Sequence, residues 1–288
     1  MPAFADAVAV TLPGGYRDAA GEWQRRAWLR PWRPADAEEL APFERTFPAR
    51  QASALLGLCL SLDGSHAAGS EVARALSVGD REALLLQLRS LTVGNKLSTV
   101  IRCPSCAEKM DLDLALTDLL LPPYDAAQPT YVHEIVAGDV RHEVRFRLPN
   151  GADQEAVAER AQHDLAGAVQ ALVERCVESI DGEHAPQISA PVVAGLADVM
   201  AGLDPQAELM LSAECPACQA AFETLLDATS VVVRELEEAR RQLYRDVHLL
   251  ASHYHWSEEQ ILALSDRKRQ LYLELIHAEW HHSRRQAS

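Results

Sequence analysis

The sequence predicts an α+β protein that is mainly helical and carries two cysteine-bearing β-hairpins separated by an α+β insertion. Three observations support this class. Two Cys-Pro-x-Cys pairs occur at residues 103–106 and 215–218, and alternating apolar and polar residues flank both pairs. Apolar residues recur at helical spacing before the first pair and after the second. The 108 residues from 107 to 214 that separate the pairs contain patterns of both kinds.

Composition and charge exclude several classes of protein. The chain has 288 residues, of which 48% are hydrophobic and 24% charged, as in an ordinary folded domain. Its net charge of −15 opposes binding to nucleic acid or to anionic lipid. The apolar runs are far shorter than the roughly 20 residues that span a bilayer, and residues 1–11 have no basic residue of the kind found in a secretory signal. We therefore expect a cytoplasmic protein without nucleic-acid or membrane partners.

The first predicted segment, residues 1–97, begins with a β-hairpin. Residues 7–12 and 24–31 have strand character, Pro13-Gly14-Gly15 predicts the turn between them, and Asp18 and Gly21 indicate a second turn region. The glycine and proline residues are placed where chain reversal requires them. This hairpin is the only β-structure that we predict before residue 98.

Arginine and tryptophan residues gather around the second strand of this hairpin. The patch comprises Arg17, Arg25, Arg26, Arg30, Arg33, Trp23, Trp28 and Trp32. Arginine and tryptophan side chains often carry the binding energy of interfaces. The candidates for partner contact are Trp23, Trp28, Arg30 and Trp32. The alternative interpretation is a half-buried strand with a solvated face.

Helices fill the remainder of the first segment. Residues 36–43 and 51–63 have helical spacing, and glycine and serine residues at 64–70 end the second run. A further helix begins at Gly79-Asp80, carries an apolar stripe of Leu84, Leu85, Leu88 and Leu91, and ends before Gly94. This helix leads directly into the first cysteine pair.

The two cysteine pairs predict one metal centre. Thiolates two residues apart on a tight turn can reach the same tetrahedral ion, and two such turns supply the four sulfurs of a closed structural zinc site. Proline follows the first cysteine of each pair and restricts the turn in the same way. Strand, knuckle and strand thus occur twice, as in a zinc ribbon. The predicted ligands of a single zinc ion are Cys103, Cys106, Cys215 and Cys218.

Two other interpretations of the cysteine pairs remain at this stage. The pairs can form two separate disulfides, or one pair can be a redox centre. A thioredoxin-like centre needs a helix after its Cys-x-x-Cys motif, whereas strands are predicted after Cys106 and Cys218. The long separation does not exclude a shared ion, because loop-closure entropy grows only logarithmically with length. Cys59 and Cys176 lie in apolar surroundings and are expected to be buried, outside the site.

The insertion, residues 121–204, has its own predicted elements. Strands at 131–136 and 141–148 flank a Gly138-Asp139 turn, a helix runs from Asp153 to about residue 179, and another covers 191–202. The first and second cysteine hairpins then lie at 98–120 and 205–228, and together they form one discontinuous unit over 98–228. The insertion is predicted to be an α+β module within that unit.

Residues 229–288 form a predicted helical C-terminal region. Helices are expected at 227–253, 257–264 and 265–282, the last two capped by Ser257 and Ser265. The basic run Arg267-Lys268-Arg269 opposes the helix dipole at its position, which slightly favours a binding role, but an exposed basic face is the preferred interpretation. Histidines are frequent here, but an exposed helix explains them better than a second metal site. These histidines are His253, His255, His277, His281 and His282.

No catalytic motif is found in the sequence. A phosphate-binding Walker loop, a G-x-G-x-x-G turn after a strand and a G-x-S-x-G elbow are all missing. A zinc ion held by four thiolates has no open coordination position for substrate. The residues therefore predict a protein that is not an enzyme.

Six stretches, in order along nearly the whole chain, carry a resemblance to a known family. They are LPGGY at 12–16 with LRP at 29–31, VGDREALLL at 78–86 with LRSLTVG at 88–94, the Cys103 knuckle with MDLDL at 110–114, RLP at 147–149 with GADQE at 151–155, the Cys215 knuckle, and HYHWSEE at 253–259 with ILAL at 261–264. Together they resemble the T-even-type phage baseplate proteins described as baseplate hub assembly chaperones. This family also occurs in phage-tail-like contractile injection systems.

The resemblance implies a function that needs no catalytic residue. Such a protein helps to build or complete the central hub of a contractile-tail baseplate, with hub or spike proteins as its partners. The four cysteines match the double knuckle of the injection-system relatives. The alternatives are a structural baseplate subunit retained in the finished tail particle, a zinc-ribbon module that binds nucleic acid, which the charge disfavours, and a thiol redox protein.

Overall fold

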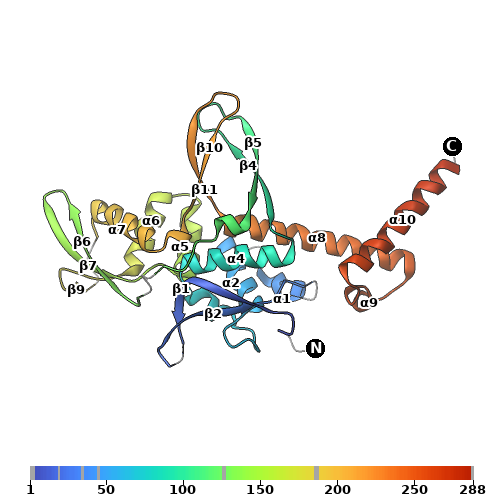
Figure 1. The fold of residues 1–288 in the computed structure, drawn as a ribbon, viewed down its shortest axis with the longest axis horizontal. Helices are drawn as coiled ribbons and strands as arrows, with labels where there is room; N and C mark the ends of the chain where they lie inside the picture. The colour runs from blue at the N-terminus through green and yellow to red at the C-terminus, as the bar shows by residue number, and fades with distance from the viewer. Residues whose placement is uncertain are drawn as a thin grey trace. The chain divides into compact units, whose positions relative to one another are not determined.

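The structure is a computed structural model that describes residues 4–18, 20–33, 36–43, 46–124, 128–184 and 188–286 (Figure 1). The fold is α+β with 49% helix and several small antiparallel sheets, which confirms the predicted class. The chain divides into two compact units, one of Met1–Trp32 and Arg45–Val232 and the other of Arg33–Glu44 and Val233–Ser288. The finer division predicted from the sequence, with boundaries at 97, 121, 204 and 228, stays a prediction.

A three-stranded antiparallel sheet opens the first unit. Strands β1 (Val8–Arg17), β2 (Trp23–Leu29) and β3 (Leu60–Ser61) lie in the order β1-β2-β3. The turn predicted at residues 13–15 is wrong, because β1 continues through these residues and the hairpin reverses at 18–22 instead. The carboxylate of Asp18 stabilises that reversal by accepting the N–H groups of Ala20 and Glu22, both at 2.9 Å.

Residues 13–15 form an irregularity inside β1. The strand register shifts between Thr11 and Tyr16. The N–H groups of Gly14 and Gly15 point away from β2 and donate to the carboxylate of Asp80, at 2.8 and 2.9 Å. A distant acceptor therefore takes the hydrogen bonds that a local turn would have used.

Three helices of the first unit precede the cysteine hairpins in the chain, and the last of them packs against β1 and β2. They are α2 (Pro48–Cys59), α3 (Ser70–Ala75) and α4 (Val78–Thr92). Ser77, not Gly79-Asp80, caps α4, because its hydroxyl accepts the N–H of Asp80. Three of the four predicted stripe leucines are fully buried, whereas Leu91 is 37% exposed. Gly94 follows the helix with a φ of +118°.

The first turn of α4 is a buried polar junction. The guanidinium of Arg81 donates to carbonyls of α2 and α3, and the carboxylate of Asp204 accepts the N–H of Gly79 at 2.8 Å. Glu82 accepts the N–H of Thr229, the second residue of α8 (Ala228–Tyr254). Burial raises the pKa values of Asp80 and Glu82 to about 7. This turn joins the N-terminal sheet, α2, α3, the end of the insertion and the start of α8.

The insertion has a core of its own. Strands β6 (Tyr131–Ala137), β7 (Val140–Phe146), β8 (Val177–Ile180) and β9 (Glu183–His184) form an antiparallel sheet in that order. Helices α5 (Gly151–Ala161), α6 (Leu165–Cys176) and α7 (Ala190–Leu203) accompany it. Its buried apolar cluster lies entirely between Tyr131 and Met200.

The single helix predicted from Asp153 to about residue 179 is wrong. Two helices and a strand occupy this range, with a break at 162–164. The carboxylate of Asp164 accepts the N–H of Gly167 at 2.8 Å and so begins α6. Residues 177–180 leave the helix because they pair with β7, a contact that no local pattern encodes.

The second unit is helical. It contains α1 (Ala37–Leu40), the 3-10 turn η2 (Ala41–Phe43), most of α8 (Ala228–Tyr254), α9 (Glu258–Leu262) and α10 (Asp266–Gln286). Ser257 caps α9 as predicted, through a capping box with Gln260. Arg269 of the basic run is only 6% exposed and pairs with Asp246 and Asp266, so its charge is used inside this unit.

A membrane-crossing helix is not found in the described residues.

Candidate metal centre

The two cysteine hairpins have the same backbone structure. The first consists of β4 (Lys96–Arg102) and β5 (Lys109–Ala115), and the second of β10 (Leu209–Glu214) and β11 (Ala221–Leu226). In each knuckle the N–H of the first cysteine donates to the carbonyl five residues later, at 2.9 and 3.0 Å. The residue after the second cysteine, Ala107 or Gln219, has a left-handed φ of 61° or 59°. The sequence repeat is therefore also a structural repeat.

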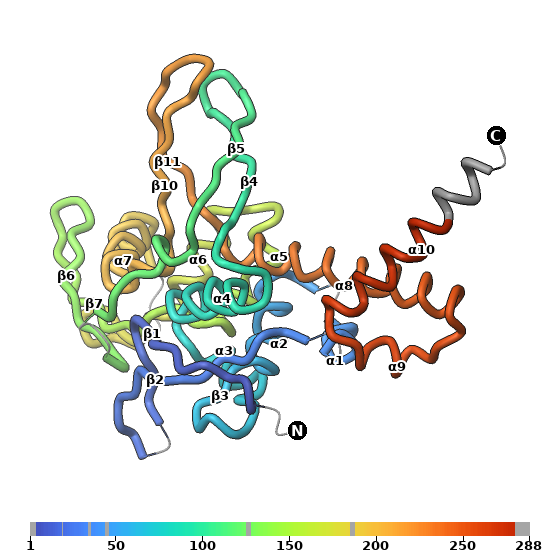
Figure 2. Tube along the Cα trace, turned by 45° about the vertical axis from the view of Figure 1, so that its right-hand side comes forward, coloured from blue at the N-terminus to red at the C-terminus, as the bar shows by residue number. Residues whose placement is uncertain are grey.

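A shared leucine core holds the bases of the hairpins together. Its members come from α4, both hairpins, the 3-10 turn η3 (Leu116–Leu119) and the first residue of α8. The buried members are Leu86, Leu97, Leu116, Leu119, Leu209, Leu226 and Ala228. The two hairpins extend side by side from this core (Figures 1 and 2). Their tips meet as a result, although more than 100 residues separate them in the chain.

The four cysteine sulfurs form a tetrahedral-sized cluster. The Sγ atoms of Cys103 and Cys218 are 3.7 Å apart, those of Cys106 and Cys215 are 3.6 Å apart, and all four lie within 4.8 Å of one another. Zinc–sulfur bonds of about 2.3 Å in tetrahedral geometry place sulfurs about 3.8 Å apart, whereas a disulfide needs about 2.05 Å. The geometry fits four ligands of one metal ion, and all the cysteines are free.

The local environment differs among the four thiols. Burial raises the pKa of Cys103, but hydrogen bonds from the N–H groups of Cys106 and Ser105 outweigh it and lower the pKa to about 6. For Cys106 the N–H of Glu108 lowers the pKa, but the neighbouring thiols of Cys215 and Cys218 raise it to about 12. Like charges at this spacing repel, so a divalent cation is the group that lets all four ionise together.

Comparison with known protein families shows which family this chain matches. The family described as T4 bacteriophage base plate protein matches residues 56–230, which is more than half of the chain. The chain belongs to this family. The matched range begins in α2, contains α4, both cysteine hairpins and the insertion, and ends in the first turn of α8. The comparisons find no match among curated proteins and none among solved structures.

The four-cysteine cluster could hold a metal ion only in a closed site. Four cysteines complete a tetrahedral shell, so a bound ion has no position for water or substrate and acts as a structural link. Cys103 and Cys215 are buried, whereas Cys106 and Cys218 are exposed at the surface. Within the described side chains no other group of three or more His, Cys, Asp or Glu residues is arranged to hold a metal ion. His281 and His282 lie outside the described side chains.

The two remaining cysteines lie in cores, as predicted. Cys59 is fully buried at the end of α2, and Cys176 is 1% exposed in the core of the insertion. Burial raises the pKa of Cys176 to about 12, so its thiol is not a reactive thiolate at neutral pH.

The predicted partner-contact residues of this baseplate protein occupy different environments. Trp23 is half-buried and its indole N–H donates to the carbonyl of Gly14 at 3.0 Å. Trp28 is half-buried, with the guanidinium of Arg26 5.1 Å from its ring centroid. Trp32 is half-buried at the end of the sheet segment. No contact joins these rings to one another among the described aromatic pairs.

Arg30, predicted as a partner-contact residue, is not at the surface in the structure. Its side chain is only 6% exposed, and its guanidinium lies 5.7 Å from the ring centroid of Phe4. Its own N–H donates to the carbonyl of Cys59. Arg30 directly follows β2, and in this conformation its side chain is buried and not available to a partner.

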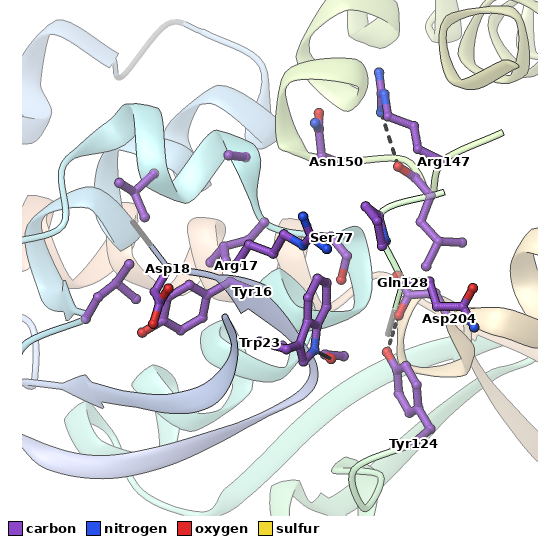
Figure 3. Close-up of a pocket in the computed structure, with 18 of the residues that line it drawn as sticks. Tyr16, Arg17, Asp18, Trp23, Ser77, Tyr124, Gln128, Arg147, Asn150 and Asp204 are labelled. Atoms are coloured by element: carbon purple, nitrogen blue, oxygen red, sulfur yellow. Dashed lines mark hydrogen bonds between the residues drawn. The ribbon is translucent and has the colours of Figure 1, made fainter. Parts of the chain in front are cut away.

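Trp23 lines a groove of about 710 Å³ that sequence analysis did not predict (Figure 3). Residues of β1, including Tyr16 and Arg17, face the segment around Tyr124 and the insertion across this groove. The hydroxyl of Tyr124 donates to the carboxylate of Asp204, whose pKa is raised by burial. These residues come from segments far apart in the chain, so no local spacing marks them.

Proposed function

We propose that this chain is a non-enzymatic assembly factor for the hub of a contractile-tail baseplate. The observation that carries the proposal is the match to the base plate family over α4, both hairpins and the insertion. A closed four-cysteine cluster supports a scaffold role, because such a site offers no position for chemistry. The protein would act in the cytoplasm, where its partners, hub or spike proteins, are assembled.

We further propose that the cluster holds one structural zinc ion. Zinc favours four thiolates in tetrahedral geometry, and the sulfur separations agree with that geometry. The ligands would be Cys103, Cys106, Cys215 and Cys218. An ion at this position would lock the hairpin tips, while the leucine core holds their bases.

The partner surface is assigned to the N-terminal sheet. Trp23 and Trp28 present half-buried rings, and Trp23 does so beside an open groove. Trp32 contributes from the end of the same segment. A partner that covers these rings gains apolar contact where the conformational cost is small, because tryptophan has few rotatable bonds.

An assembly factor must bind unassembled partners more tightly than finished particles. We would quantify a tagged copy by mass spectrometry in lysate and in purified particles. Recovery with hub or spike proteins in lysate but not in particles supports the assembly role. Stoichiometric presence in particles makes the chain a structural subunit instead, and recovery with neither contradicts both.

The surface assignment has a separate test. Trp23→Ala and Trp28→Ala should each weaken capture of purified hub or spike proteins about tenfold without unfolding the protein, as circular dichroism would show. Leu165→Ala is the matched control, because Leu165 is 71% exposed on α6, away from the sheet. Equal capture by the tryptophan variants and the control would contradict the assignment.

A further inference from the structure

A second groove lies wholly within the second unit. Its volume is about 470 Å³, within the range of about 300–1,000 Å³ that is usual for binding clefts. Helices α1, α8 and α9 supply its walls. The lining residues are Ala37, Glu38, Leu243, Tyr244, Glu258, Glu259, Leu262 and Ala263.

The floor of this groove is apolar. Ala37 and Leu243 are only 3% and 4% exposed, and Leu262 is half-buried beside them. Tyr244 stands at the wall with 44% of its surface exposed. Ala37 and Leu243 are already covered by the protein, so the apolar surface open to another molecule is that of Tyr244, Leu262 and Ala263.

The rim of the groove carries only negative charge. Glu38, Glu258 and Glu259 are exposed, and the lining contains no lysine, arginine or histidine. In the described part of the chain no ion pair joins any of these three carboxylates to a cation. On α8, by contrast, Glu237 and Glu238 each pair with Arg241, at 3.7 Å.

Two simpler explanations cover only part of this arrangement. All three glutamates stand in the first turns of short helices, where a negative charge favours the helix dipole. That effect stabilises α1 and α9 but leaves the rim negative and the floor open. A metal ion is not the occupant, because within the described residues only the four cysteines form a group that can hold one.

We propose that this groove binds a basic amphipathic helix of a protein partner. Leucine-like side chains of that helix would cover Tyr244, Leu262 and Ala263, and its lysine or arginine side chains would face the three glutamates. Helix-in-groove recognition uses this combination of an apolar stripe and a charged rim. The net charge of −15 adds long-range attraction for a cationic partner. The inference stands apart from the proposed function, because it concerns a different surface and names its partner by chemistry.

The test uses the full chain and two synthetic peptides of 18 residues. One is an amphipathic helix of leucine and lysine, and the other has the same leucines with glutamate in place of lysine. Fluorescence anisotropy at physiological salt should show binding of the lysine peptide and none of the glutamate peptide. Failure of the lysine peptide to bind would overturn the proposal.

Variants locate the site of binding. The groove variant carries Glu38→Gln, Glu258→Gln and Glu259→Gln, and should bind the lysine peptide at least tenfold more weakly than the wild type. A control with the same net charge carries glutamine at three exposed positions of the first unit, Glu159, Glu208 and Glu223. This control should keep wild-type affinity. Equal weakening of both variants would show non-specific attraction and overturn the proposal.

Tyr244→Ala tests the apolar half of the groove and leaves every charge in place. It should weaken binding of the lysine peptide several-fold, with unchanged circular dichroism and melting temperature. This variant serves as the test if the triple variant fails to fold. An unchanged affinity of Tyr244→Ala for the lysine peptide would contradict binding in the groove. None of these outcomes depends on whether the chain is recovered with hub proteins, so the two proposals fail separately.

Discussion

Replacement of Cys215 by serine is expected to release the tips of both cysteine hairpins and to leave their base folded. Cys215 is fully buried, and its Sγ lies 3.6 Å from that of Cys106. A tetrahedral site that lacks one of four thiolates binds zinc poorly. The leucine core at the base contains no cysteine and does not need the ion.

The predicted loss of stability at the hairpin tips depends on the length of the loop that the metal closes. The shortest loop runs from Leu97 to Cys103, across the metal to Cys215, and back to Leu209. It is closed at its base because Leu97 and Leu209 belong to the same leucine core. This loop has about 15 residues, for which closure is worth about 3 kcal/mol in the chain-entropy model. Closure of the longer loop through the insertion, which exceeds 100 residues, would contribute about 4.7 kcal/mol. The leucine core at the base already closes most of that longer loop without the metal. A loss of about 3 kcal/mol raises the opening equilibrium of the tips roughly a hundredfold.

Hydrogen exchange with mass spectrometry measures that opening. In Cys215→Ser, and in wild type treated with a chelator, peptides from β4, β5, β10 and β11 should exchange roughly a hundredfold faster. Peptides from the insertion, which has its own core, should not change. Metal analysis should find one zinc per wild-type chain and none in the variant. Ser105→Ala is the control, because it changes the knuckle without removing a ligand and should keep both zinc and protection.

Three results would refute this reasoning. Full zinc occupancy in Cys215→Ser would mean that the ligands lie elsewhere. Unchanged exchange at the tips after loss of zinc would mean that the ion does not hold them. Equal loss of protection in the insertion would mean that its core depends on the metal centre.

Three further predictions concern the folded core. In Glu82→Gln the side-chain oxygen can accept the N–H of Thr229 and the side-chain NH2 can donate to the Thr229 hydroxyl, so both contacts persist without a buried charge. Because burial raises the folded pKa of Glu82 to about 7, the wild type loses stability as pH rises from about 4 to 7. In denaturant unfolding the variant should exceed the wild type by about 3 kcal/mol at pH 8 and match it at pH 4. Phe146→Ala should lower the free energy of unfolding by about 3–5 kcal/mol, because Phe146 is fully buried in the core of the insertion. The core of the insertion should unfold while zinc is retained, and metal analysis would check this. Gly57→Ala should lower the free energy of unfolding by about 1–3 kcal/mol, since a Cβ there would lie 2.6 Å from the backbone of α3. Gly202→Ala, where a Cβ meets open space, should raise it by up to about 1 kcal/mol. Equal melting temperatures for the two variants would contradict this prediction.

Local sequence patterns predicted most of the elements that frame the metal centre. The turn of each Cys-Pro-x-Cys knuckle, the strands beside it and the capping box at Ser257 all depend on residues within a few positions of one another. The same is true of the hairpin around Gly138, whose φ is +65°. Such features can be read from spacing because the interactions that form them are local.

Local patterns failed where a distant group competed. Gly14 does not turn the chain, because Asp80, 66 residues away, accepts its N–H. Residues 177–180 leave a helical pattern to pair with β7. Arg30 is a charged residue in an arginine- and tryptophan-rich stretch, yet it is buried with its guanidinium over the ring of Phe4.

By itself the sequence determined the fold class, the duplicated knuckle and the four cysteines that are candidate metal ligands, because residue type and spacing specify a turn and its donors. Only the tertiary structure decided that the two knuckles meet, through a leucine core drawn from segments more than 100 residues apart. It likewise decided which arginine and tryptophan residues face solvent and where the two grooves lie. Those properties depend on packing between remote segments, and the free energy of such packing is not encoded in any short stretch of the chain.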